Sequence, residues 1–139
     1  MRYLIDTNVF VRFLVKDNEQ MFKDCERLFL AVEAGGIKGF APSHAMAELV
    51  WVLQSFYRFE KPKILSALKS FEIHGVFIDD RLDFSLAVEL FETSSVKFLD
   101  ALLASHELVQ NGKAAVVSYD KDFDKLGVPR KEPKDIIQK

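Results

Sequence analysis

Short strand-like runs alternate with longer helical stretches along the whole sequence. Runs rich in β-branched or aromatic residues occur at 2–6, 37–41, 76–78 and 114–118. Between them lie segments of helical periodicity, which we place at 8–15, 19–34, 43–56, 62–70, 83–93 and 99–110. The alternation predicts an α/β fold with a central parallel sheet flanked by helices. A chain of 139 residues fits one such domain over residues 1–139, ending in a short strand near Val128 and a surface segment.

Charge and composition bear on whether the protein binds nucleic acids or membranes. The formal net charge is −2 at pH 7, so the chain lacks the basic surface with which nucleic-acid-binding proteins usually hold phosphates. A bound divalent cation is another source of positive charge for such a function. No apolar run reaches the roughly 18 residues of a membrane span, and Cys25 is the only cysteine. We therefore expect a cytoplasmic protein with no membrane association.

Two of the expected strands end on carboxylates. The first strand, in the stretch LIDTNVF, ends at Asp6, which is either the N-cap of the next helix or a ligand beyond the strand end. Thr7 and Asn8 follow directly and could cap that helix in its place. The last long strand, in AAVVSYDKDF, is followed by Asp120 and Asp122. Asp120 is nearer to the strand end, and Asp122 is a candidate supporting residue.

Two further acids lie inside apolar helical stretches. Glu48 lies in AMAELVWVL and Asp100 in FLDALLASH, each among mainly nonpolar neighbours. Glu48 is either an exposed acid at the edge of an amphipathic helix or a partly buried charge that needs a partner. Asp100 is either an acid favoured by the dipole at the start of its helix or a group carried towards the strand ends. The small residues Ala101 and Ala104 would let that helix approach the sheet closely.

The chemistry of such acids depends on whether they converge. Carboxylates a few ångströms apart repel one another and raise each other's pKa unless a cation neutralises them. A set of oxygen ligands selects Mg²⁺ or Mn²⁺ rather than zinc. One or two such ions can activate a water molecule for attack on a phosphodiester, so the implied reaction is hydrolysis.

The stretches LIDTNVF, AMAELVWVL, FLDALLASH and VVSYDKDF stand here in the order typical of one family. With them the sequence resembles the PIN-domain ribonucleases, and most closely the VapC-type toxins of toxin–antitoxin pairs. The resemblance implies a three-layer α/β/α PIN-like fold and a metal-dependent endoribonuclease that uses Mg²⁺ or Mn²⁺. It also implies an RNA substrate, an antitoxin that blocks the site, and a homodimer. The acids it assigns to catalysis and metal binding are Asp6, Glu48, Asp100 and Asp120.

Other polar residues are expected to support this site. Asn8 matches the polar residue that follows the first aspartate in the family, and Ser118 stands where the family often has threonine. The family varies at the fourth acid, so Asp120, Asp122 or both could complete the set. Arg12 lies one helical turn after Asn8 and is either a contact for a substrate phosphate or a solvated surface arginine.

Two other functions stay open on the sequence alone. An aspartate-based phosphatase or phosphotransferase would use Asp6 as its nucleophile, but it leaves Glu48 without a role. A noncatalytic binding module would keep the PIN-like fold and use only a surface that faces an antitoxin. The presence of all four acids counts against that second alternative.

Overall fold

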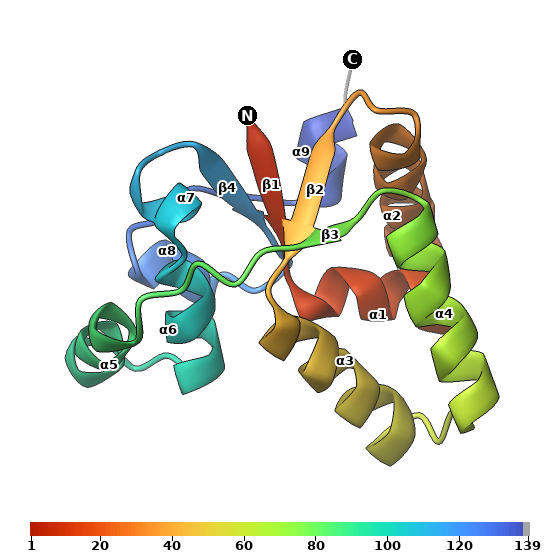
Figure 1. Ribbon diagram of the computed structural model, residues 1–139, viewed down its shortest axis with the longest axis horizontal. Coiled ribbons are helices and arrows are strands. Elements are labelled where there is room, and N and C mark those ends of the chain that lie inside the picture. Colours follow the sequence, from red (N-terminus) through yellow and green to blue (C-terminus); the bar gives the residue numbers. More distant parts are fainter. Residues whose placement is uncertain (138–139) are drawn as a thin grey trace.

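The chain folds around a parallel sheet of five strands (Figure 1). The structure is a computed structural model that describes residues 1–137. The strands lie in the order β3-β2-β1-β4-β5, and every neighbouring pair is parallel. Their bounds are β1 Arg2–Ile5, β2 Lys38–Ala41, β3 Phe77–Ile78, β4 Ala114–Val117 and β5 Arg130–Lys131. The predicted parallel sheet is confirmed, with the last strand just beyond Val128.

Helices cover both faces of this sheet. In Figure 1, helices α1, α2 and α4 lie to the right of the strands, and α6, α7 and α8 lie to their left. This is the three-layer α/β/α arrangement that the alternation of strands and helices predicts. The helices are α1 Thr7–Val15, α2 Glu19–Glu33, α3 Ser43–Ser55, α4 Lys61–Ile73, α5 Phe84–Thr93, α6 Phe98–Ala104, α7 Glu107–Gln110, α8 Asp122–Lys125 and α9 Pro133–Ile137.

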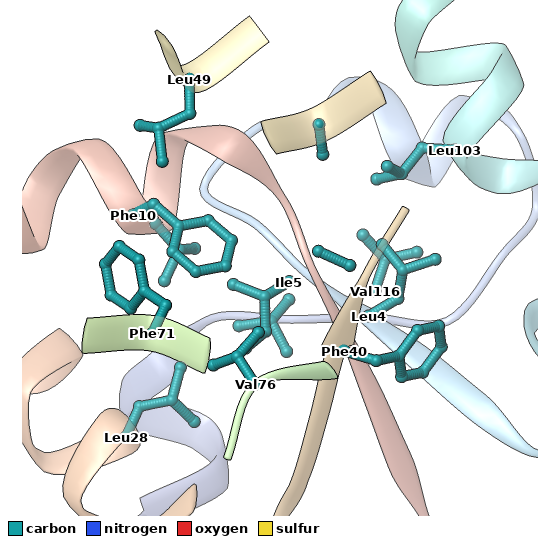
Figure 2. Packing of buried hydrophobic residues seen from close by; sticks show 14 of the residues in the cluster. Leu4, Ile5, Phe10, Leu28, Phe40, Leu49, Phe71, Val76, Leu103 and Val116 are labelled. Atoms are coloured by element: carbon teal, nitrogen blue, oxygen red, sulfur yellow. The ribbon is translucent and has the colours of Figure 1, made fainter. Parts of the chain in front are cut away.

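The core lies on both sides of β1, the central strand. Leu4 and Ile5 are fully buried, and as successive residues of a strand they point to opposite faces of the sheet. Removing each such side chain from water contributes roughly 1.5–3 kcal/mol. Figure 2 shows the two packing groups, with Phe10, Leu28, Phe71 and Val76 around Ile5, and Phe40, Leu103 and Val116 around Leu4.

The helix expected over residues 99–110 is two helices, α6 and α7. The helix is interrupted at Ser105 and His106. The His106 ring caps the start of α7, because its Nδ1 atom accepts a hydrogen bond from the Leu108 amide over 3.1 Å. The other ring nitrogen, Nε2, lies 3.1 Å from both the carbonyl and the Oδ1 atom of Asp79. Since Nδ1 accepts a hydrogen bond, Nε2 carries the ring proton and donates a hydrogen bond to Asp79. The break is thus fixed by a residue that follows β3.

The segment after β5 is more ordered than the expected surface segment. It forms α9, which packs against α2, and its first residue, Pro133, is buried. The final stretch therefore covers part of α2. Among the helices of residues 1–137, none is long and apolar enough to cross a membrane.

Candidate functional site

The carboxyl ends of β1 and β4 meet at one edge of the sheet and bring Asp6 beside Ser118. The strands pair in register, with Ile5 beside Val117, and the Asp6 amide donates to the Val117 carbonyl over 3.0 Å. Ser118 is fully buried, and its hydroxyl donates to Asp6 Oδ2 over 2.7 Å. Asp6 therefore lies where open parallel sheets bind their ligands.

Asp6 is also the N-cap of α1. Its Oδ1 atom accepts the Thr7 amide over 2.8 Å, which satisfies one of the free donors at the helix start. The expectation that Thr7 and Asn8 cap this helix in its place is therefore wrong. Thr7 instead donates its hydroxyl to the Ala45 carbonyl over 3.1 Å, which ties α1 to the first turn of α3. Cap and site residue are not alternatives for Asp6, because its two oxygens make different contacts.

The Ser118 hydroxyl holds three other groups in place. Besides donating to Asp6, its Oγ atom accepts the Asn8 side-chain amide over 3.1 Å and the Asp120 backbone amide over 2.9 Å. One donor and two acceptor lone pairs are all that a hydroxyl offers, so Oγ is fully used. Asn8 also accepts the Tyr119 amide at Oδ1 over 3.3 Å, which fixes the orientation of its own amide. Asn8 and Ser118, two of the three predicted supporting residues, thus connect the start of α1 to the turn after β4.

Asp100, Asp120 and Asp122 lie close enough to share an ion. One carboxylate oxygen from each lies within 4.8 Å of the other two. Asp120 Oδ1 also accepts the Asp122 amide over 2.9 Å, which holds the turn that carries both residues. The carboxylates of Asp120 and Asp122 therefore reach the same place, whereas the sequence left the choice between them open.

Asp100 is the acid whose burial most needs an explanation. It lies in the first turn of α6 with only 5% of its surface exposed, and its Oδ2 atom is buried without a hydrogen-bond partner among residues 1–137. Burial raises the pKa of Asp100 to about 7, and the nearby charge of Asp6 adds to that effect. The approach that brings it here depends on Ala101 and Ala104, which are both fully buried. An unpartnered buried carboxylate oxygen is costly unless a cation or a proton satisfies it.

Asp6 shows the same electrostatic pattern. Burial raises its pKa to about 6, although the hydrogen bonds from Ser118 and Thr7 work in the opposite direction. The negative charge of Glu48 repels that of Asp6 and raises the pKa of Asp6 further. Glu48 is half-buried on α3, at the edge of the helix side that Ala45, Leu49 and Leu53 bury. All four predicted acids thus act electrostatically on one another or on a shared neighbour: Asp6 after β1, Glu48 on α3, Asp100 on α6 and Asp120 after β4.

That shared neighbour is Lys97, which the sequence did not place in the site. It is the N-cap residue of α6, and its carbonyl accepts the Asp100 amide over 3.1 Å. Partial burial lowers the pKa of its ammonium group, but four carboxylates outweigh that effect and raise it: those of Asp100, Glu48, Asp120 and Asp6. Lys97 is therefore a cation that faces the whole set of acids. Its only signal in the sequence is its place one helical turn before Asp100.

Arg12 is engaged elsewhere in this structure. Its Nη1 atom lies 2.7 Å from Asp17 Oδ1, and the ion pair is partly exposed, so it adds little to stability. Asp17 raises the pKa of the guanidinium, and Tyr57 contributes to the same shift. The contact between Arg12 and a substrate phosphate stays a prediction.

The donor set fits a hard divalent cation. All of its acids offer oxygen, the ligand that Mg²⁺ and Mn²⁺ prefer, and no cysteine lies among them. Burial raises the pKa values of Asp6 and Asp100, repulsion from neighbouring carboxylates adds to both shifts, and a nearby cation would lower both values. An ion at these acids could also satisfy the Asp100 Oδ2 atom, which has no hydrogen-bond partner in the part of the chain that the structure describes.

Comparison with known proteins agrees with this geometry. The model of one protein family, the PIN domain, matches residues 3–129. A curated relative, the VapC ribonuclease of Aquifex aeolicus (strain VF5), is 29% identical over 131 residues. That alignment covers 94% of this chain and 96% of the relative. The match to the PIN domain model begins within β1 and ends just before β5, so it includes every acid described above.

Proposed function

Since the chain belongs to the PIN domain family, we propose that it is a metal-dependent endoribonuclease that hydrolyses RNA phosphodiester bonds. The observation that carries the proposal is the convergence of Asp100, Asp120 and Asp122, each of which places one carboxylate oxygen within 4.8 Å of the other two. Asp100 supports it further, because its Oδ2 atom is buried without a hydrogen-bond partner among residues 1–137. The similarity to a VapC ribonuclease supports RNA as the substrate. The proposed ion is Mg²⁺ or Mn²⁺, because both accept a site made of oxygens.

The acids have distinct parts in this proposal. Asp100, Asp120 and Asp122 hold the ion, and Asp6 and Glu48 complete the negative field around it. A bound divalent ion supplies a water molecule with a lowered pKa and stabilises the charge that develops on the phosphate. Ser118 and Asn8 act as positioning residues, since they hold Asp6 and the turn of Asp120 through hydrogen bonds. Lys97 supplies a fixed positive charge beside the acids, where it can attract a phosphate.

We also propose the biological setting that the relative's name suggests. The protein is the toxin of a VapBC-type pair, one domain over residues 1–139, which works as a homodimer in the cytoplasm. A cognate antitoxin protein would bind over the acids and prevent access of RNA. A gene for a short antitoxin-like protein beside the gene of this chain would support that setting. Copurification of the two proteins would test the contact directly.

Cleavage of RNA by acid variants tests the proposed reaction. A structured RNA pool is incubated with Mg²⁺ or Mn²⁺ and either the wild-type protein or Asp100→Asn. We expect wild-type cleavage that stops on chelation, and a loss of at least about 100-fold in Asp100→Asn, because the substitution removes one of the ion's ligands. Asp124→Asn is the matched control, since Asp124 is exposed on α8 and pairs with Arg130. Equal cleavage by wild type and Asp100→Asn, or none with any divalent ion, would show that the proposal is wrong.

A further inference from the structure

Trp51 is an exposed aromatic side chain on the helix that carries Glu48. It is the only tryptophan in the chain, and 66% of its surface is exposed on α3. Tryptophan is usually well buried in proteins, or else lies at a binding surface where its large ring provides contact area. The apolar side of α3 that faces the core is made by Ala45, Leu49 and Leu53 instead. Packing among residues 1–137 therefore leaves most of the Trp51 side chain uncovered.

The position of Trp51 on α3 ties it to the site. Trp51 follows Glu48 by three residues, so the two are neighbours on the helix surface with Cβ atoms about 5–6 Å apart. Helical side chains lean towards the N-terminus, so we expect the Trp51 ring over the turn that contains Ala47 and Glu48. Ala47 is exposed and too small to cover the ring. Helix geometry thus brings an aromatic surface to the side of α3 that carries Glu48.

The charge of the protein indicates what such a surface could bind. With a net charge of −2, the chain has no excess of basic residues to hold an RNA backbone, and the lysines beside the acids are Lys97 and Lys125, the second of which pairs with Asp122 over 3.2 Å. Besides the bound ion, contacts to bases can then supply part of the affinity. Aromatic side chains stack unpaired bases whatever their sequence, whereas the bases of a duplex are already stacked on one another. A permanent contact between two copies at Trp51 would instead cover the surface next to Glu48, where the substrate must enter.

We propose that Trp51 is the platform on which an unpaired RNA base stacks, next to the phosphodiester held at the acids. This inference rests on the proposed ribonuclease function and specifies its substrate as single-stranded RNA. The metal-binding acids position the phosphate, and Trp51 positions the nucleoside beside it. Trp51 would then determine which RNA conformations are cut rather than the chemistry of the cut.

The single tryptophan provides a direct test that does not depend on cleavage. Asp6→Asn protein is titrated with an unstructured RNA of about ten nucleotides while Trp51 fluorescence and the anisotropy of the labelled RNA are recorded. We expect fluorescence quenching that follows the binding curve, and no quenching with a duplex of the same sequence. Binding without any change in Trp51 fluorescence would overturn the proposal. So would an emission change that depends on protein concentration before RNA is added, because Trp51 would then lie between protein copies.

Variants of Trp51 test the same contact in the active protein. Trp51→Ala should lose about tenfold or more in RNA affinity and in kcat/KM, whereas Trp51→Phe keeps a ring and most of both. Mn²⁺ affinity should be unchanged in both variants. Phe56→Ala is the matched control, because Phe56 is 74% exposed at the end of α3 and lies on another side of the helix. If the wild type cuts and Trp51→Ala cuts equally well, the stacking proposal alone is wrong. If the wild type cuts nothing, the ribonuclease proposal is wrong.

Discussion

At the scale of single residues, the Ser118 hydroxyl organises the buried end of the sheet. It connects Asp6, Asn8 and the Asp120 amide through one oxygen atom. Ser118 and its partner Asp6 are both buried, so a water molecule cannot take the place of the hydroxyl unless there is space for it. The geometry of the acids therefore depends on a residue that carries no charge.

Replacing Ser118 by alanine tests this dependence. Ser118→Ala removes a donor from Asp6 and an acceptor from the Asp120 amide, so we expect a loss of about 1–3 kcal/mol in the free energy of unfolding. Cleavage should fall as well, because Asp6 and Asp120 lose their common anchor. Urea unfolding and the cleavage rate measure the two effects. Ser66→Ala, on the exposed side of α4, is the control and should change stability by less than about 0.5 kcal/mol. A Ser118→Ala protein as stable as this control would contradict the role assigned to the hydroxyl.

The acids could be found from the sequence, but their surroundings could not. Asp6 and Asp120 follow apolar strands, and Glu48 and Asp100 interrupt apolar helices, so each contradicts its local pattern. Lys97 contradicts nothing, because a lysine before a helix is ordinary. Its role depends on where α6 docks against the sheet, and that is decided by contacts far apart in the chain.

At the scale of elements, the approach of α2 to the sheet depends on Gly39 of β2. A Cβ atom at Gly39 would lie 2.9 Å from Ile5 Cδ1 and 3.2 Å from Val32 Cγ2. Ile5 and Val32 are buried core residues on β1 and α2, so neither can move away freely. Glycine inside a strand weakens the strand itself, and here it allows the helix to pack closely.

Gly39→Ala should therefore destabilise the protein. The added methyl group overpacks the contact between β2 and α2, and we expect a loss of about 1–3 kcal/mol in the free energy of unfolding. Gly36→Ala is the matched control, because a Cβ there would lie at an ordinary 3.8 Å from the Ala31 carbonyl. That variant should be as stable as wild type or more stable by up to about 1 kcal/mol. Equal stability of the two variants in urea would rule out the close packing at Gly39.

The order of elements follows from the sequence, but the break between α6 and α7 does not. The apolar period continues through residues 99–110, which is why one helix was expected there. The break depends on the bond from His106 to Asp79, a residue 27 positions earlier. Likewise, α9 is short and charged, and it is ordered by packing against α2 rather than by its own propensity. Local patterns cannot report such distant contacts.

At the scale of the whole molecule, the acids make the metal-free protein sensitive to pH. Burial raises the pKa of Asp6 to about 6 and that of Asp100 to about 7. Between about pH 4 and 7, the native protein therefore holds protons that the unfolded chain has released, so its stability falls as the pH rises. Asp79 works in the opposite direction, because Arg81 holds its pKa far below the ordinary value. That effect is confined to pH values below about 4, where stability is lost as the pH falls.

Urea unfolding in the presence of a chelator measures this dependence. We expect the free energy of unfolding to fall by a few kcal/mol between about pH 5 and about pH 8. For Asp100→Asn we expect a smaller fall in the free energy of unfolding, because an asparagine side chain does not ionise in this pH range. Mn²⁺ should stabilise the wild type, and more strongly at the higher pH, since protons compete with the ion for the carboxylates. Stability that rises over this range without metal would contradict the assignment of Asp6 and Asp100 as buried, repelling acids.

The central claim is that these acids hold a divalent ion that the protein uses to cut RNA. The initial rate of RNA cleavage, recorded as a function of Mn²⁺ concentration, tests it most directly. For the wild type we expect a rate that is negligible without metal and saturates as Mn²⁺ is added. For Asp120→Asn we expect saturation only at a concentration at least about tenfold higher, with a lower maximal rate. Cleavage that is independent of Mn²⁺ and Mg²⁺, or a curve for Asp120→Asn identical to that of the wild type, would contradict the claim.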